Sequence, residues 1–253
     1  MYSEATFSPE ASGSISVSPS HKKKSRQAAD LTLAYLKAKD VGGVLNIHST
    51  IPEGKGLGSS TADCIAVVHA IADSLKVKLR DAEVARLVVE AEVASDNIMF
   101  SRAVLFAHRE GEVIEDFGRE VPKMVVLGID TAQESHVNTL EYPPAVYSWR
   151  QLQSFCTLTA ALRRAIHSND INLLGRVATA SSQINQLFLP KKMFNEVREI
   201  AHECGALGVA CAHSGTVLSV LLDPDDKALE HRIDRIMESL SRLNISDILR
   251  FQT

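Results

Sequence analysis

A glycine-rich stretch with two adjacent serines, residues 51–63 (IPEGKGLGSSTAD), carries the residues best suited to chemistry. A short β-rich run ends at Pro52, and a helix is predicted to begin near Ser59. The alternating glycines between them permit positive φ angles and close backbone approach. The first N–H groups of a helix have no partner within the helix, and together with the helix dipole they attract anions. The stretch therefore predicts either a tight turn or an anion-binding loop.

Side chains in the same stretch favour the anion-binding loop. Ser59, Ser60 and Thr61 supply hydroxyl groups that can bind phosphate or a magnesium ion. Lys55 adds a positive charge that can follow phosphate groups. The pattern is not a Walker A loop, because no Gly-Lys-Ser/Thr sequence closes it. The residues by themselves leave the identity of the anion open.

The composition limits the partners of the protein. The chain has 253 residues, of which 45% are hydrophobic and 23% charged, with a formal net charge of −4. This profile is typical of one large or two small globular domains, without the basic field or aromatic content that nucleic-acid binding requires. The basic run at 22–24 is expected to be a solvated helix start. The four cysteines form no C-x-x-C pair, and no apolar run is long enough for a membrane span. We expect a soluble cytoplasmic protein with no nucleic-acid or membrane partner.

Strands and helices are predicted along the whole chain, and these elements must position the loop. Strands are expected at 43–52, 102–108, 111–118, 122–131, 206–212, 216–223 and 245–251, and helices at 21–40, 59–75, 81–92, 148–167, 171–186, 191–204 and 225–243. The run at 122–131 is almost continuously apolar, which is typical of a central strand. Residues 118–122 form the best domain boundary, so an α+β protein with domains 1–120 and 121–253 is expected, with antiparallel strands in at least one half.

Two finer expectations concern the first elements. Weak alternation at Tyr2, Phe7, Ile15 and Val17 predicts edge strands of a hairpin that turns at Gly13, with a mobile tail as the alternative. Helical spacing predicts one apolar face for each of the first three helices. These faces comprise Leu31, Ala34, Tyr35 and Ala38; Ala62, Ile65, Ala66, His69, Ala72 and Leu75; and Val84, Leu87, Val88 and Ala91.

Two motifs resemble those of the GHMP kinases, the superfamily of galactokinase, homoserine kinase, mevalonate kinase and phosphomevalonate kinase. PEGKGLGSSTAD is similar to the phosphate-binding motif of that family, P-x-x-x-G-L-G-S-S-A, and matches every fixed position from Pro52 to Ser60. GALGVACAHSGTVLSVLLD, at 205–223, resembles the C-terminal glycine motif, a loop that closes on the active site. The resemblance implies a GHMP kinase-like α+β fold, with an N-terminal half like ribosomal protein S5 domain 2 and a ferredoxin-like C-terminal half.

The combination of GKGLGSSTAD with AHSGT resembles the L-threonine kinase branch, which makes O-phospho-L-threonine for the nucleotide loop of cobalamin. KSRQAADLTLAYL, SDNIMF and IDTAQESHVNTLEY also resemble that branch, although Ala132-Gln133 replaces its usual glycine pair. This resemblance implies ATP as the phosphate donor, Mg²⁺ as the metal and a hydroxylated amino acid as the acceptor, with homoserine as the nearest rival of L-threonine.

The resemblance also implies roles for individual residues. The nucleotide is expected to bind Pro52, Gly54, Lys55, Gly56, Leu57, Gly58, Ser59, Ser60 and Thr61. Magnesium is expected to bind Ser60 or Ser59, together with Glu92 or Glu90. The acceptor is expected to contact some of His213, Ser214, Gly215, Thr216, Asp130 and Thr131.

Asp96, in SDNIMF, is expected to be the general base that accepts the proton of the acceptor hydroxyl, as a corresponding aspartate does in mevalonate- and galactokinase-like members. Homoserine kinases work without such a base. The alternative role for Asp96 is the N-cap of a helix over NIMF.

The first motif of the superfamily, in this branch a Gly-Glu-Leu-x-Gln-Gly type segment, is not found in the sequence. The chain is therefore expected to start after that segment, which helps to shape the substrate pocket. A nucleotide-binding pseudokinase is the alternative to an active kinase, and the sequence is compatible with a homodimer.

Overall fold

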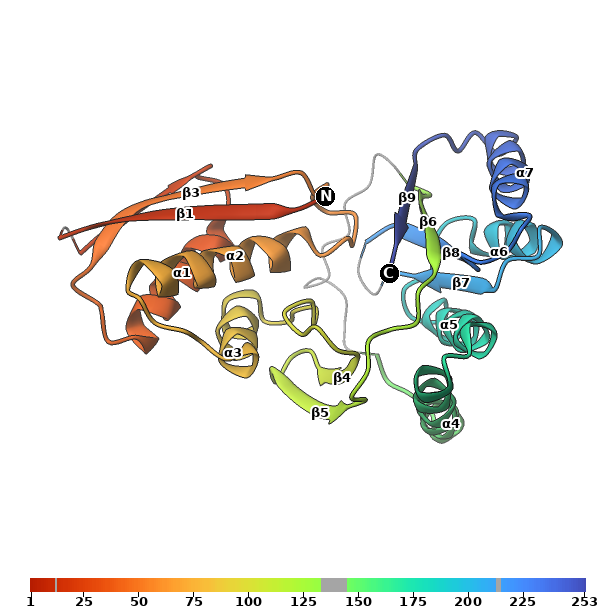
Figure 1. Cartoon of the computed structure of the whole chain (residues 1–253), viewed down its shortest axis with the longest axis horizontal. Coiled ribbons are helices and arrows are strands. Elements are labelled where there is room, and N and C mark those ends of the chain that lie inside the picture. The colour runs from red at the N-terminus through yellow and green to blue at the C-terminus, as the bar shows by residue number, and fades with distance from the viewer. Residues whose placement is uncertain (12, 133–144, 213–214) are drawn as a thin grey trace. The chain divides into compact units, whose positions relative to one another are not determined.

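The structure is a computed structural model that describes residues 1–11, 13–132, 145–212 and 215–253. The chain forms two compact units (Figure 1). Unit 1 comprises Met1–Glu53 and Gly58–Gly118, and unit 2 comprises Gly54–Leu57 and Arg119–Thr253. Four residues of the glycine-rich loop thus pack with the C-terminal part of the chain. The boundary between domains 1–120 and 121–253 stays a prediction.

Unit 1 is built on a three-stranded sheet of β1 (Ser3–Glu10), β3 (Gly42–Ser49) and β2 (Ile15–Ser18), in that order. β1 runs antiparallel to β3 and β2 runs parallel to it. The edge positions of β1 and β2 are confirmed, but the hairpin pairing is wrong, because both strands pair with β3 and not with each other. β3 buries Leu45 and Ile47, and pairing on both sides satisfies its backbone groups.

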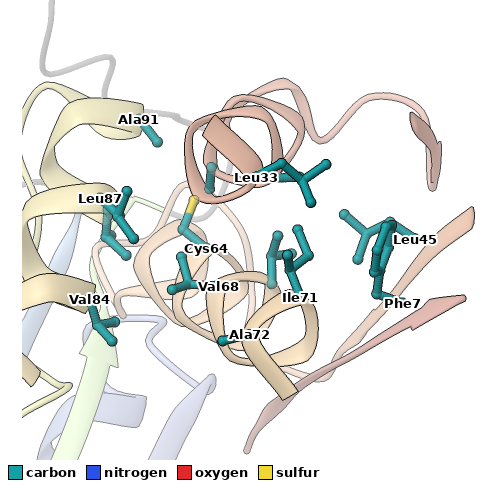
Figure 2. Close-up of a cluster of buried hydrophobic side chains, with 14 of the residues drawn as sticks. Phe7, Leu33, Leu45, Cys64, Val68, Ile71, Ala72, Val84, Leu87 and Ala91 are labelled. Atoms are coloured by element: carbon teal, nitrogen blue, oxygen red, sulfur yellow. The ribbon is translucent and has the colours of Figure 1, made fainter. Parts of the chain in front are cut away.

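Helices α1 (Lys23–Tyr35), α2 (Ser59–Ser74) and α3 (Asp81–Glu92) pack on one another, with α2 lying against β1, and a hairpin of β4 (Val104–Ala107) and β5 (Glu112–Asp116) follows them. Figure 2 shows part of the hydrophobic core that these elements enclose. The side chains labelled there are Phe7 and Leu45 from the sheet, Leu33 from α1, Cys64, Val68, Ile71 and Ala72 from α2, and Val84, Leu87 and Ala91 from α3.

The buried face is confirmed for α3 and only in part for α1 and α2, where Ala72 is buried and Leu31, Ile65 and Leu75 are half-buried against the core. α1 buries Ser25, Ala28, Ala29, Thr32 and Leu33, and Tyr35 is 49% exposed. α2 buries Cys64, Val67, Val68, Ile71 and Ala72 and leaves His69 exposed. Apolar residues surround most of α2, so periodicity cannot select its buried side. In α1, small residues permit close contact with α2, and the Thr32 hydroxyl is satisfied by the Ala28 carbonyl, 2.6 Å away.

Unit 2 contains a four-stranded antiparallel sheet in the order β7 (Gly208–Cys211), β8 (Val217–Leu222), β6 (Val125–Asp130), β9 (Ile248–Gln252). The prediction of a central strand is confirmed, since every residue of β6 is buried. The helices of this unit are α4 (Trp149–Ser168), α5 (Ile171–Asn185), α6 (Phe194–Glu203) and α7 (Leu229–Ser241).

Alternate residues of β6 face two hydrophobic clusters. Val125, Leu127 and Ile129 pack with residues of α6 and α7. Val126 packs with residues of α4 and α5. Because helices cover both faces of the sheet, its central strand is a continuous apolar run and does not alternate with polar residues. The α+β class is confirmed, and none of the helices in the described ranges has both the length and the apolarity to cross a bilayer.

Gly175 in α5 provides a test of how closely this helix packs on β7. A Cβ atom at Gly175 would overlap the carbonyl group of Leu207. Alanine normally stabilises a helix by about 0.5–1 kcal/mol relative to glycine. Here we expect Gly175→Ala to lower the free energy of unfolding by about 1–3 kcal/mol, because overpacking forces the helix away from the strand. Denaturation in urea measures this change.

Ser181→Ala, at an exposed position of the same helix, is the control and should change stability by less than about 0.5 kcal/mol. An alanine at position 175 that leaves the protein as stable as the wild type would contradict the close packing.

Candidate active site

The glycine-rich loop has the conformation that its sequence predicts. Gly54, Gly56 and Gly58 have φ angles of 74°, 80° and 72°, in the left-handed region that favours glycine. Gly58 is the N-cap of α2, and no side chain caps this helix. The Ala62 amide bonds the Gly58 carbonyl, so the amide groups of residues 59–61 have no partner within the helix. The start of α2 therefore presents N–H donors to an anion.

A buried carboxylate lies beside the first turn of α2. The Thr61 hydroxyl donates to Glu92 Oε2 at 2.7 Å, and Lys24 Nζ lies 3.4 Å from the other carboxylate oxygen. Glu92 is only 3% exposed, whereas Glu90 is exposed. Of the two carboxylates considered from the sequence, only Glu92 is brought to the helix start, because it follows the buried face of α3.

Asp96 lies against the glycine N-cap. Its Oδ2 is 3.0 Å from the point where a Cβ atom at position 58 would lie, and its amide donates to Thr61 Oγ1 at 3.4 Å. The Asp96 side chain is exposed. The alternative N-cap role is wrong, since residues 97–100 form a turn in which the Phe100 amide bonds the Asn97 carbonyl, and no helix follows. An accessible carboxylate thus stands at the uncapped start of α2.

Lys22 holds the residues on either side of the loop within unit 1. Its ammonium group pairs with Glu53, just before the loop, and with Asp63, in the second turn of α2. The side chains of Lys22 and Asp63 are 8% and 3% exposed. Burial by itself would lower the pKa of Lys22, but the hydrogen bonds to both carboxylates outweigh it and hold this pKa above its usual value. The expectation that 22–24 is wholly solvated is wrong at Lys22.

Within unit 2, Asp130 at the end of β6 forms an ion pair and a hydrogen bond. Lys55 Nζ lies 2.6 Å from Asp130 Oδ2, and the Thr216 hydroxyl donates to Oδ1, also at 2.6 Å. The neighbouring Thr131 hydroxyl donates to the Thr216 carbonyl at 3.1 Å. Burial would raise the pKa of Asp130, but the hydrogen bonds from Lys55 and Thr216 outweigh it and hold this pKa below its usual value. These four residues, singled out from the sequence, are joined directly.

The second glycine motif packs on the first. A Cβ atom at Gly215, which has φ of 96°, would overlap the backbone of Lys55 and Gly56. The Thr216 amide also donates to the Lys55 carbonyl at 3.3 Å. Only glycine permits this approach, so the two sequence motifs meet backbone to backbone in unit 2. The expected acceptor contacts His213 and Ser214 lie outside the described residues.

The remaining residues expected to bind nucleotide differ in accessibility. Pro52 is exposed, Leu57 and Ser60 are half-buried, and Ser59 is buried. Lys191, which the sequence patterns do not single out, also reaches the second glycine motif: its Nζ donates to the Gly215 carbonyl at 2.7 Å, and its side chain is buried. The pair Lys191-Lys192 follows a proline, a pattern typical of a surface turn, so no local feature marks it.

Two family models match the chain, one described as the GHMP kinases N terminal domain, over residues 24–102, and one as GHMP kinases C terminal, over residues 161–240. Together they cover more than half of the chain. The chain therefore belongs to the GHMP kinase family, a class of phosphotransferases that act on a hydroxyl group of a small molecule.

The relatives of known function include two L-threonine kinases. The chain is 28% identical to that of Citrobacter freundii over 80% of its own length and 68% of the relative's. It is 30% identical to that of Salmonella typhimurium over 71% of its own length and 59% of the relative's. Among solved structures, a homoserine kinase from Cytophaga hutchinsonii superimposes with a TM-score of 0.73 at 18% identity, over 98% of this chain and 84% of that one.

The stability of unit 2 should depend on the charge of Asp130. We expect Asp130→Asn to lower the free energy of unfolding at pH 7 by roughly 3 kcal/mol, because it leaves the Lys55 ammonium group without its buried partner. The folded-state pKa of Asp130 lies below its usual value, so this contribution is complete above the unfolded-state pKa of about 3.9 and is lost as the pH falls through the folded-state pKa. Denaturation curves between pH 3 and 7 measure the effect.

Asp234→Asn, on the exposed side of α7, is the matched control and should have little effect at any pH. If the free energies of unfolding of the wild type and Asp130→Asn differ by the same amount from pH 7 down to pH 3, the carboxylate charge does not stabilise unit 2.

Proposed function

We propose that this protein is an ATP- and Mg²⁺-dependent kinase that converts L-threonine to O-phospho-L-threonine. One observation carries the proposal: the accessible carboxylate of Asp96 lies against Gly58, at the uncapped start of α2. This arrangement combines a candidate base with an anion-binding helix terminus, which phosphoryl transfer to a hydroxyl requires. The similarity to two L-threonine kinases supports the choice of acceptor.

The first turn of α2 would hold phosphate groups of ATP. The amide groups of Ser59, Ser60 and Thr61 have no partner within the helix, and the helix dipole adds positive potential at this end. Gly58, in the left-handed region, places no side chain of its own over these amides. The Ser60 hydroxyl, on a half-buried residue, can add a further contact.

The residues beside α2 fit a magnesium ion that is shared with the nucleotide. Among the described residues, no group of three His, Cys, Asp or Glu side chains could hold a metal. Mg²⁺ commonly takes one or two carboxylates and completes its shell with substrate phosphates and water. Glu92 supplies such a carboxylate, oriented by Thr61. When bound, magnesium would neutralise the charge that develops on the phosphate oxygens.

Asp96 would act on the acceptor. Its carboxylate takes the proton of the threonine hydroxyl while the hydroxyl oxygen forms a bond to the γ-phosphorus, and the bond from that phosphorus to ADP breaks. Such a product would serve the nucleotide loop of cobalamin, as the resemblance of the motifs implies. We also propose that residues 1–120 and 121–253 are its two domains, and that it works in the cytoplasm, where ATP is available.

The role of Asp96 can be tested by ADP release. Purified protein with ATP and Mg²⁺ should release ADP when L-threonine is added, and less with L-serine or L-homoserine. Asp96→Asn should lower kcat about 10²–10⁴-fold, because general-base assistance is lost, and should leave the Kd of ATP within about twofold. Ser60→Ala should weaken ATP binding as well as turnover. Asp73→Asn, exposed at the far end of α2, is the control.

Two outcomes would count against this proposal. Protein that binds ATP but releases no ADP with any hydroxylated amino acid would be the nucleotide-binding pseudokinase. Asp96→Asn with unchanged kcat would remove Asp96 from the chemistry and leave the kinase assignment in place.

The metal ligand can be tested by comparing two neighbouring glutamates. Glu92→Gln should raise the Mg²⁺ concentration for half-maximal turnover by about tenfold or more, since a carboxamide is a weaker magnesium ligand than a carboxylate. The glutamine oxygen can still accept from Thr61, so the fold should be kept. Glu90→Gln removes an equal charge from the exposed side of α3 and should leave the Mg²⁺ dependence unchanged. The reverse result would assign the metal to Glu90.

A further inference from the structure

Lys24 and Glu92 form an ion pair within unit 1, beside the start of α2. Glu92 is the last residue of α3, and its side chain is only 2% exposed. Lys24 Nζ lies 3.4 Å from Glu92 Oε1, and the Thr61 hydroxyl donates to Oε2 at 2.7 Å. The two oxygens of this carboxylate thus meet two different partners, one charged and one neutral.

The charged partner is held less tightly than the neutral one. A charge-assisted N–H···O hydrogen bond is usually about 2.7–2.9 Å long, so the 3.4 Å between Nζ and Oε1 is a loose contact. The Lys24 side chain is 47% exposed and can leave the carboxylate for solvent. The side chain of Lys22, two residues earlier, is 8% exposed and pairs with both Glu53 and Asp63. Of these two lysines, Lys24 is therefore the one that can exchange.

The helix that carries Lys24 does not by itself explain a lysine at this position. Lys24 is the second residue of α1, and a positive charge near a helix N-terminus opposes the helix dipole. A buried carboxylate, in contrast, needs a compensating charge, because removing it from water costs several kcal/mol. The lysine is therefore placed for Glu92 rather than for its own helix.

We infer that Lys24 is an exchangeable counter-ion, which neutralises Glu92 until a divalent cation takes its place. This inference rests on the proposed function, in which Glu92 is a ligand of magnesium. Mg²⁺ carries twice the charge of an ammonium group and approaches carboxylate oxygens to about 2.0–2.1 Å, so it attracts Glu92 more strongly. Two cations at one carboxylate repel each other, and the half-exposed side chain of Lys24 can move away. Lys24 thus compensates the buried carboxylate in the absence of metal and lowers its affinity for metal.

Metal binding can be measured without turnover, from the electron paramagnetic resonance signal of free Mn²⁺ titrated with protein in the absence of nucleotide. Lys24→Met removes the competing charge and should lower the Kd of Mn²⁺ about 2–10-fold, a change that corresponds to the loss of a partly exposed ion pair. Lys24→Arg should bind Mn²⁺ no more tightly than the wild type. Lys23→Met, at the exposed neighbouring position, removes an equal charge and should leave the Kd unchanged.

A double variant shows whether the competition takes place at Glu92. In a protein that carries Glu92→Gln, adding Lys24→Met should no longer change the Kd of Mn²⁺, because the shared carboxylate is gone. An equal decrease in this background would place the competition at another group and overturn the inference. An unchanged or raised Kd in the single variant Lys24→Met would also overturn it.

Thermal unfolding separates this exchange from a purely structural role. Without a divalent cation, Lys24→Met should have a lower Tm than the wild type, because it takes the compensating charge away from the buried Glu92 carboxylate. Saturating Mg²⁺ at constant ionic strength should reduce the difference in Tm, since the metal replaces the lysine and its binding stabilises the folded state. A difference in Tm that Mg²⁺ does not change would give Lys24 a structural role only and overturn the inference.

This inference and the proposed function can fail separately, because neither measurement needs an acceptor or turnover. If the wild type releases no ADP with any hydroxylated amino acid but Lys24→Met binds Mn²⁺ more tightly, the kinase assignment fails and the exchange at Glu92 stands. If the wild type is an active kinase and Lys24→Met binds Mn²⁺ as the wild type does, the exchange is wrong and the proposed function stands. Failure of both proteins to bind Mn²⁺ without nucleotide would likewise overturn the exchange.

Discussion

The contact between Lys55 and Asp130 decides where the glycine-rich loop belongs. Lys55 lies in the four residues, Gly54–Leu57, that pack with unit 2 although the chain on either side belongs to unit 1. A lysine that is only 17% exposed needs an opposite charge, and the end of β6 provides it in Asp130. Thr216 then satisfies the second carboxylate oxygen. Because these partners come from 55, 130 and 216, a single carboxylate joins three distant parts of the sequence.

The backbone of the loop depends on glycines at two positions. Gly215 can approach Lys55 and Gly56 only without a side chain, and Gly58 can begin α2 in the left-handed region with little strain. Within unit 1, Lys22 holds Glu53 and Asp63 on either side of the loop. Lys22 and Lys55 are thus both engaged in ion pairs, whereas the amide groups of residues 59–61 have no partner within α2.

The two carboxylates beside α2 differ in their environment, and this difference suggests separate roles. Glu92 is buried and held by Thr61, which suits a metal ligand whose position must not change. Asp96 is exposed and lies at the glycine N-cap, where an incoming hydroxyl group could meet it. For a member of the GHMP kinase family, such a division between a charge that is held and a charge that is accessible fits phosphoryl transfer, in which positioning and charge neutralisation contribute most.

Local sequence predicted the features that depend on a few neighbouring residues. Short-range sterics explain the positive φ angles of Gly54, Gly56 and Gly58 and the start of α2 at Ser59. A run of apolar residues explains the central strand β6. The two glycine motifs also indicate the family, because each is a short run of neighbouring residues. These features were predictable because the cause and the effect lie within a few residues of each other.

Long-range contacts decided the rest. Four features depend on partners far along the chain. They are the pairing of β1 and β2 with β3, the buried faces of α1 and α2, the buried position of Lys22, and the burial of Glu92 and not Glu90 beside α2. A lysine followed by another lysine looks solvated in sequence, yet Lys191 is buried because tertiary packing brings the Gly215 carbonyl to its ammonium group. By itself, the sequence determined the glycine-rich conformation of the loop and the membership of a kinase family. Only the tertiary structure decided which charges hold that loop, because burial and ion pairing arise when distant segments meet.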